Sequence, residues 1–150
     1  MISKSLILAL LGGVVFALPV HAQTSYPLSL QNCGVDLTID AAPDRAVTVG
    51  QAATEILYAL GLGERVKGTS VWFTDVLPEY AALNAEIPRL ADNDPSFEAV
   101  VAQRPDLVAV QYEWHIGPQG IVATRDQFAR MVQQVRQQLE LLRGQADRLA

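Results

Sequence analysis

The sequence predicts an α/β fold in which a small, mostly parallel sheet is flanked by helices and ends in a long helix. From residue 46 onward, short apolar runs typical of buried strands alternate with segments whose apolar residues recur at helical spacing. After residue 124 the chain becomes a long polar run crossed by a regular apolar seam. Strands and helices in alternation form βαβ units, whose right-handed crossovers place helices on the faces of the sheet.

The first 22 residues have the features of a secretory signal. Lys4 precedes an apolar run from Leu6 to Leu18, and Val20-His21-Ala22 supplies the small or apolar residues of a cleavage site. The apolar run is shorter than the roughly 20 residues that cross a bilayer. We therefore expect residues 1–22 to be a signal peptide, and the mature protein to be periplasmic without inserting into the membrane.

The elements of the fold are expected in a regular order. Residues 28–31 and 35–39 alternate apolar and polar side chains around a turn at 32–34, which predicts a hairpin. Asp94 and Pro95 are residue types that cap and begin helices, so we expect Asp94 to be the N-cap of the third helix. The sequence predicts further strands at 46–49, 66–69, 87–90 and 107–110, and helices at 52–60, 77–83 and 94–102.

The final segment predicts a long amphipathic helix. Thr124 and Gln127 form the T-x-x-Q pattern of a capping box. We place the end of the domain at residue 130, so that a domain at 23–130 is followed by a helix at 131–150 whose packing partner is open. The apolar residues beyond the cap follow the spacing of a heptad seam: Phe128, Val132, Val135, Leu139, Leu142, Ala146 and Leu149.

Composition excludes several function classes. The chain has 11 basic and 16 acidic side chains and a formal net charge of −5, so neither nucleic acid nor an anionic membrane is an expected partner. Cys33 is the only cysteine, which excludes a disulfide within the chain. The sequence lacks the G-x-S-x-G, H-E-x-x-H and G-x-x-x-x-G-K motifs. We therefore expect neither catalytic activity nor a resident cofactor.

Aromatic residues follow two of the predicted strands. Trp72 and Phe73 come after the strand at 66–69, and Tyr112 and Trp114 come after the strand at 107–110. Ligands of parallel sheets bind beyond the carboxyl ends of the strands, and aromatic faces hold large flat ligands. These four residues are therefore candidate ligand contacts. The alternative is that their rings pack the loops onto the core.

Two polar residues at the same predicted edge are further candidates. Gln51 follows the strand at 46–49 and could donate hydrogen bonds to a ligand, or it could cap its own loop. His115 is the only histidine after Ala22, and one histidine cannot build a multi-histidine zinc or manganese site. His115 or Tyr112 could be an axial ligand of haem iron. An exposed loop histidine is the commoner case, and we expect it for His115.

Several motifs occur in a fixed order along the chain. Residues 54–68 have the pattern T-E-I-L-x-A-L-G-L-x-x-R-V-x-G, followed by P-S-x-E-A-V at 95–100 and R-P-D-L-V at 104–108. Together they resemble the periplasmic substrate-binding proteins of ABC importers for iron–siderophore complexes, haem and cobalamin. The resemblance covers residues 26–130.

The resemblance implies a bilobal protein in which one long helix joins two α/β lobes and the ligand binds between them. Only the motifs of the first lobe are present, so we expect a Rossmann-like N-terminal lobe and a truncated form that lacks the second lobe. The tail after residue 130 weakly resembles the joining helix, or it is unrelated sequence. The implied function is to bind a pre-formed iron chelate, a ferric siderophore, and deliver it to an ABC permease in the inner membrane.

The resemblance also implies residue roles and alternatives. Surface glutamates of the family dock onto permease arginines, and Glu79 and Glu86 are the candidates here. Some members that bind anionic hydroxamates place an arginine near the third helix, where this sequence has Asp92-Asn93-Asp94. One alternative is a haem- or cobalamin-binding member of the same family. Another is a small periplasmic interaction protein that dimerises through the C-terminal heptad helix.

Overall fold

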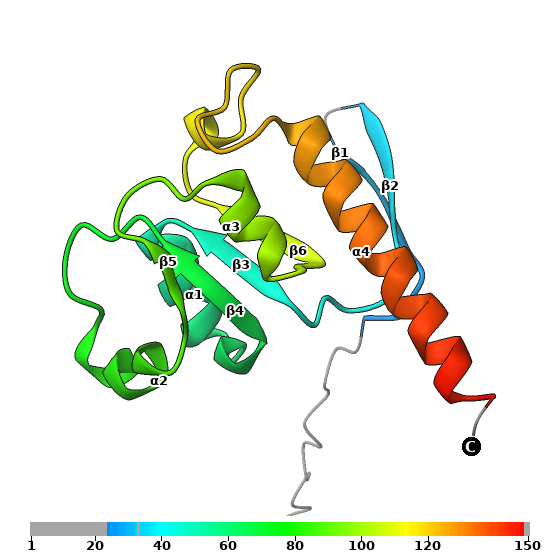
Figure 1. Cartoon of the computed structure of the whole chain (residues 1–150), viewed down its shortest axis with the longest axis horizontal. Coiled ribbons are helices and arrows are strands. Elements are labelled where there is room, and N and C mark those ends of the chain that lie inside the picture. Colours follow the sequence, from blue (N-terminus) through cyan, green and yellow to red (C-terminus); the bar gives the residue numbers. More distant parts are fainter. Residues whose placement is uncertain (1–23, 33, 149–150) are drawn as a thin grey trace, which may run out of the picture. The chain divides into compact units, whose positions relative to one another are not determined.

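The computed structural model describes residues 24–32 and 34–148, and the chain divides after Ala41 into two compact units. The first unit holds an antiparallel hairpin of β1 (Leu28–Asn32) and β2 (Val35–Ile39), drawn in blue and cyan in Figure 1. The predicted hairpin is thereby confirmed. The signal peptide expected at 1–22 and the single cysteine, Cys33, lie outside the described residues.

The second unit is built on a four-stranded parallel sheet. Its strands are β3 (Ala46–Val49), β4 (Val66–Ser70), β5 (Arg89–Ala91) and β6 (Leu107–Val110), and they lie side by side in the order β5-β4-β3-β6. Each neighbouring pair is parallel. The chain therefore starts in the middle of the sheet, builds outward to β5, and then crosses back to add β6 on the other side of β3. The predicted α/β class is confirmed.

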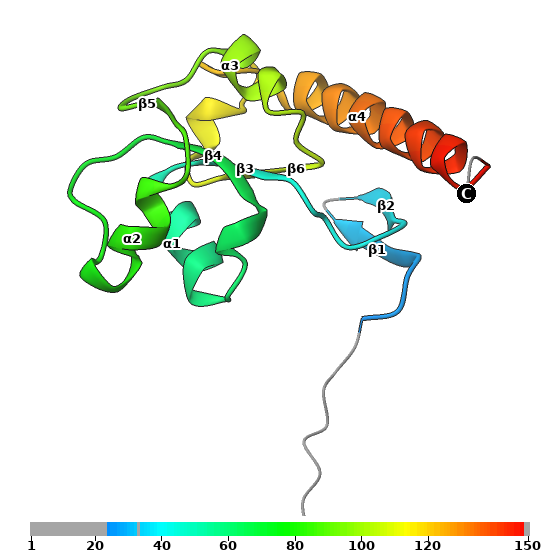
Figure 2. The same ribbon diagram turned by 60° about the horizontal axis from the view of Figure 1, so that its bottom comes forward.

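Helices cover both faces of this sheet (Figure 2). On one face lies α1 (Gln51–Ala59), which packs against β3 and β4. On the other face lie α3 (Phe97–Ala102) and the long helix α4 (Arg125–Ala146). The short helix α2 (Ala81–Ala85) follows a 3₁₀ turn, η2 (Pro78–Tyr80), where the sequence predicts one helix at 77–83. Two more 3₁₀ turns, η1 (Gly63–Arg65) and η3 (Glu113–His115), follow α1 and β6.

The main core lies between the sheet and the pair α3 and α4. Val47 and Val49 alternate with polar or small residues along β3, so both point to the same face, and both are fully buried. They pack in one cluster with Val100 of α3 and with Phe128 and Met131 of α4. Each such side chain stabilises the fold by about 1.5–3 kcal/mol. The first half of α4 is therefore an integral part of the domain.

The long helix begins at the predicted cap. Thr124 Oγ1 accepts a hydrogen bond from Gln127 N at 3.3 Å, and Gln127 Oε1 accepts one from Thr124 N at 2.8 Å, so the capping box is confirmed. The two halves of the heptad seam differ in burial. Its first half packs on the domain's own core, whereas Leu142 in its second half is 51% exposed. Among the described residues, no helix is long and apolar enough to cross a membrane.

The start of α3 differs from the prediction. Its N-cap is Ser96, whose Oγ accepts a hydrogen bond from Ala99 N at 3.1 Å, and not Asp94. Both residue types cap helices well, so the local pattern does not separate them. The Asp94 carboxylate is instead used by a residue from a distant loop, His115, at 2.8 Å. The prediction that Asp94 caps this helix is wrong because a tertiary contact holds its side chain.

Helices α1 and α2 are joined by a buried tyrosine. Tyr58 of α1 donates a hydrogen bond from its hydroxyl to Asn84 Oδ1 at 2.9 Å, and its ring meets that of Tyr80 edge to face. Burial, and secondarily the charge of Glu55, raises the pKa of Tyr58 to about 12. The phenol is therefore neutral throughout the physiological pH range.

Candidate functional site

At the carboxyl edge of the sheet, the neighbouring strands β3 and β6 have connections that diverge. The chain leaves β3 into α1 on one face, and it leaves the neighbouring β6 toward α4 on the other face (Figure 2). In open parallel sheets, ligands bind where adjacent connections diverge in this way, because the loops part and leave a crevice. The loops that begin at Gly50 and Gln111 meet at this point.

Gly50 and Gln111 fasten the two diverging loops to each other. Gly50 has a φ of 130°, and a Cβ at this position would overlap the side chain of Gln111, so only glycine fits here. Gln111 Oε1 accepts a hydrogen bond from Ala52 N at 3.0 Å, which satisfies one free N–H group at the start of α1. Sequence reasoning missed Gln111, although a glutamine directly after an apolar strand was a visible signal.

Three aromatic side chains, Phe73, Tyr112 and Trp114, form a cluster at this edge that we call the aromatic platform. The rings of Tyr112 and Trp114 stack with centroids 4.2 Å apart and 10° between their planes. Phe73, from the loop after β4, meets Tyr112 edge to face at 6.3 Å. Trp114 is 55% exposed and Phe73 is 66% exposed. The structure thus brings together three of the four predicted aromatic residues and leaves large ring surfaces open to solvent.

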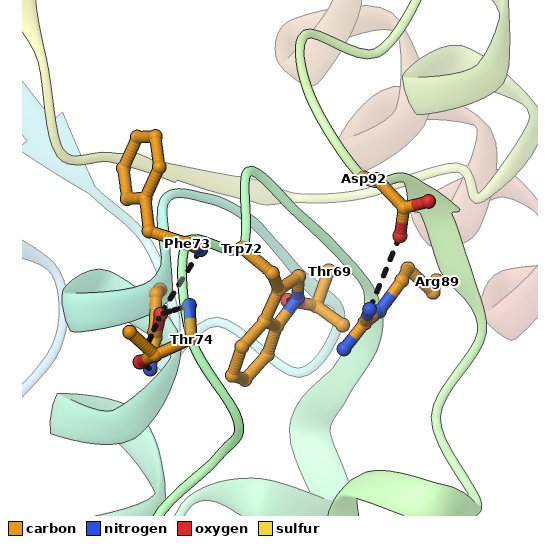
Figure 3. A network of polar contacts seen from close by, with 7 residues as sticks. Thr69, Trp72, Phe73, Thr74, Arg89 and Asp92 are labelled. Carbon is orange, nitrogen blue, oxygen red and sulfur yellow. Dashed lines mark hydrogen bonds and ion pairs between the residues drawn. The ribbon is translucent and has the colours of Figure 1, made fainter.

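Trp72 points in a different direction from its neighbour Phe73 (Figure 3). The residue before it, Val71, has a φ of 61°, in the left-handed region that a β-branched residue rarely adopts. The strained turn accompanies a change from a buried Trp72, which is 8% exposed, to an outward Phe73. Directly after Val71, the chain thus places one aromatic residue in the core and the next in the platform.

The contacts of Trp72 are those of a packing residue. Its Nε1 donates a hydrogen bond to Thr69 Oγ1 at 3.0 Å, and the guanidinium carbon of Arg89 lies 5.0 Å from its ring centroid (Figure 3). Thr69 belongs to a fully buried hydroxyl chain in which Thr54 Oγ1 lies 2.8 Å from Thr69 Oγ1 and 2.7 Å from Thr48 Oγ1. These contacts correspond to the alternative predicted for Trp72, a ring that packs its loop onto the core.

Gln51 fastens the loop that carries Phe73. Its Oε1 accepts hydrogen bonds from the backbone N–H groups of Phe73 and Thr74, both at 3.2 Å. Its Nε2 donates to Thr74 Oγ1 at 3.0 Å and to the carbonyl of Asp75 at 3.2 Å. Both ends of the amide are thus used within the protein, as expected for loop capping, the second of the two roles predicted for Gln51.

His115 lies directly beneath the platform, and the expectation that it is an exposed loop residue is wrong. Only 1% of its surface is exposed, because its ring packs against the rings of Tyr112 and Trp114 at 5.7 and 5.6 Å. Its Nε2 bonds to Asp94 Oδ1 at 2.8 Å. Its Nδ1 is buried and meets no hydrogen-bonding partner among the described residues. Neither ring nitrogen therefore faces solvent.

A sequence model of the family described as periplasmic binding protein matches residues 47–143. The chain belongs to this family. The match covers the parallel sheet, the platform and nearly all of α4. The predicted resemblance to the substrate-binding proteins of ABC importers is confirmed, and the family's role is to bind substrates for transport.

Individual relatives agree with this membership. The chain is 31% identical over 84 residues to YvrC, an uncharacterized ABC transporter substrate-binding lipoprotein of Bacillus subtilis (strain 168). That match covers 55% of this chain and 25% of the relative. A periplasmic binding protein from Veillonella parvula has a similar structure, with a TM-score of 0.59 and 25% identity over 70% of this chain and 35% of that one. The chain thus spans about a quarter to a third of the length of these two proteins.

A further solved structure is that of an ABC-type Fe³⁺-hydroxamate transport system from Saccharomonospora viridis. It has a TM-score of 0.48 and 30% identity, over 67% of this chain and 39% of that one.

The two glutamates expected to dock a permease lie in the segment between β4 and β5. In this periplasmic binding protein, Glu79 lies in η2 and Glu86 caps the C-terminus of α2. Both are exposed, as a docking residue must be. Their docking role stays a prediction.

Proposed function

We propose that this chain provides one side of the ligand site of an ABC substrate-binding protein for iron complexes, with a ferric siderophore as the ligand. The observation that carries the proposal is the exposed stack of Tyr112 and Trp114, with Phe73 beside it, at the point where the connections of the sheet diverge. Open aromatic faces of this kind bind large ligands through dispersion and desolvation. Family membership supports a transport role.

The arrangement of His115 favours a pre-formed chelate over haem. An axial histidine must present a ring nitrogen to the iron. Here Nε2 bonds to Asp94 and Nδ1 is buried, so iron coordination by His115 requires the loop to open. A siderophore brings its iron already coordinated, and the protein then needs only a complementary surface. Cobalamin, another large chelate of this kind, shares that property and is the nearest alternative ligand.

Calorimetric titration of the protein with ferrichrome, a neutral ferric trihydroxamate, tests the proposal. We expect Trp114→Ala to weaken binding by about tenfold, because a stacked aromatic contact contributes up to ~1.5 kcal/mol. The matched control is Leu60→Ala, which removes a similarly exposed apolar side chain from the far end of α1. Equal affinities of the Trp114→Ala variant and the unaltered protein would overturn the platform as the ligand site.

We also propose a second function, self-association through the second half of α4. The observation that favours it is the exposure of Leu141 and Leu142, at 68% and 51%, beyond the part of the helix that packs on the core. Sedimentation equilibrium tests it. A stable dimer that dissociates in the double variant Leu141→Glu, Leu142→Glu supports the second function, and a monomer at all concentrations excludes it.

A further inference from the structure

The loops at the carboxyl edge of the sheet carry carboxylates but neither lysine nor arginine. These loops are residues 50–52, 71–78, 92–96 and 111–124, and the structure describes every residue in them. Their acidic side chains are all exposed: Asp75, Asp92, Asp94 and Glu113. The lysine and arginine count of these loops is zero, so their formal charge is negative.

Three of these carboxylates belong to residues that bond to the ring beneath the platform or adjoin the platform in the chain. Asp94 bonds to His115, whose ring packs under Tyr112 and Trp114. Glu113 lies in the chain between the two stacked rings. Asp75 follows Phe73 by two residues, in the loop that Gln51 fastens. The three carboxylates thus come from the loops after β4, β5 and β6, which carry the platform or bond to the histidine beneath it.

Two arginines, Arg89 and Arg125, lie beside acidic residues of these loops. Arg89 lies over the ring of Trp72, and its Nη1 is 3.1 Å from Asp92 Oδ1, so it offsets the fourth carboxylate (Figure 3). Arg125, at the start of α4, lines a cavity of about 500 Å³ together with Glu113 and Asp126. The four loop carboxylates and Asp126 outnumber these two arginines, so the formal charge of the group stays negative.

We infer that the platform accepts the neutral or cationic face of a metal chelate and disfavours polyanionic chelates. The inference rests on the proposed function and narrows its substrate class. Two independent effects point the same way. The carboxylates attract positive and repel negative charge, and the faces of aromatic rings carry negative potential that also attracts cations.

Three chelates of different charge test the inference: ferrioxamine B, which is cationic, ferrichrome, which is neutral, and ferric enterobactin, a tris-catecholate trianion. We expect the protein to bind ferrioxamine B and ferrichrome more tightly than ferric enterobactin. Added salt should weaken the binding of ferrioxamine B, because the attracting carboxylates are exposed and their charge is screened.

A charge-neutralising variant separates charge from the chemistry of the chelating groups. The double variant Asp75→Asn, Glu113→Gln should weaken ferrioxamine B binding by about two- to tenfold and strengthen ferric enterobactin binding, since an exposed charge pair contributes up to about fivefold. The control is Glu64→Gln, Glu140→Gln, which removes the same charge from η1, before β4, and from the second half of α4. We expect the control to leave both affinities within about twofold.

The outcomes distinguish the two levels of the proposal. The inference on charge is overturned if ferric enterobactin binds more tightly than the other two chelates. It is also overturned if the double variant does not weaken ferrioxamine B binding and strengthen ferric enterobactin binding. Either result leaves the platform as a chelate site. Binding of none of the three chelates overturns the proposed function and the inference with it.

Discussion

The Nε2 atom of His115 lies 2.8 Å from Oδ1 of Asp94, although the two residues are 21 positions apart in the chain. The contact joins the loop after β5 to the loop after β6, and it lies directly under the stacked rings of Tyr112 and Trp114. Because the buried imidazole contacts both rings, we expect Asp94 to position the platform through His115.

Removing this carboxylate should loosen the platform. We expect Asp94→Ala to lower the free energy of unfolding by about 1 kcal/mol, the typical net value of one hydrogen bond, and to shift the emission of Trp114 toward the red. Asp94→Asn keeps an acceptor for Nε2–H and should restore the emission of the unaltered protein. Asp92→Ala is the neighbouring control, because Asp92 pairs with Arg89 and not with His115. A spectrum that Asn fails to restore would contradict the positioning role.

The buried hydroxyl of Thr54 should contribute more than an ordinary surface threonine. Its Oγ1 donates to the carbonyl of Gly50 at 3.0 Å and also contacts the hydroxyls of Thr48 and Thr69. Thr54→Val keeps the shape but leaves buried polar groups with fewer partners, which costs about 1–3 kcal/mol of the free energy of unfolding. Thr38→Val, on the exposed β2, should change it by less than about 0.5 kcal/mol. Urea denaturation measures both, and equal values would refute the network's role.

Alkaline pH should destabilise the protein through Tyr58. The folded protein keeps the phenol proton up to a pKa of about 12, whereas the unfolded chain loses it near 10.0. The stabilisation is complete below pH 10 and is lost as pH rises toward 12, at up to ~1.4 kcal/mol per pH unit. Tyr58→Phe should flatten this decline and, because the bond to Asn84 is lost, start from a lower stability at neutral pH. Unfolding curves across this pH range check both, and an unchanged slope would count against the raised pKa.

The two halves of the α4 seam should respond differently to truncation. Phe128 packs in the core against Phe97, with ring centroids 5.7 Å apart, so Phe128→Ala should cost about 3–5 kcal/mol. Leu142 is half exposed, and Leu142→Ala should cost less than about 1 kcal/mol in the monomer. Thermal unfolding at low protein concentration compares them. Similar losses at the two positions would mean that the second half is covered in solution.

Glu79 and Glu86 should affect transport and not ligand binding. Both are exposed on the segment between β4 and β5. If they meet permease arginines, reversing both charges to lysine lowers siderophore uptake in cells while the affinity for ferrichrome stays the same. The matched control is the reversal of Glu64 and Glu140. Normal uptake by the Glu79, Glu86 variant would exclude the docking role.

Local sequence patterns were sufficient to predict the order of the strands and helices. The strands predicted at 46–49 and 107–110 match β3 and β6 residue for residue, because four consecutive apolar or β-branched residues between breakers carry a strong signal. The segment predicted as a strand at 87–90 has a weaker apolar pattern. The observed strand, β5, begins two residues later and ends one residue later. Asp94 and Ser96 were interchangeable as caps on local grounds.

The candidate site was only partly visible in the sequence. The aromatic residues after the strands were recognisable as a group because parallel strands end at one edge of the sheet. The sequence did not show which ring turns inward. Trp72 and Phe73 are adjacent, and only the contact of Trp72 with a buried hydroxyl distinguishes them. Gln111 was missed because its role is a hydrogen bond to Ala52, in an element far away in sequence.

Periodicity and motifs within short stretches were enough to predict the βαβ order, the capped final helix and the family. The tertiary structure decided that His115 is buried against Asp94, that Gln51 fastens a loop, and that the first half of the heptad seam packs on the domain's own core. Each of these depends on side chains that meet across long separations in the chain, and only the packing of the sheet and its helices brings them together.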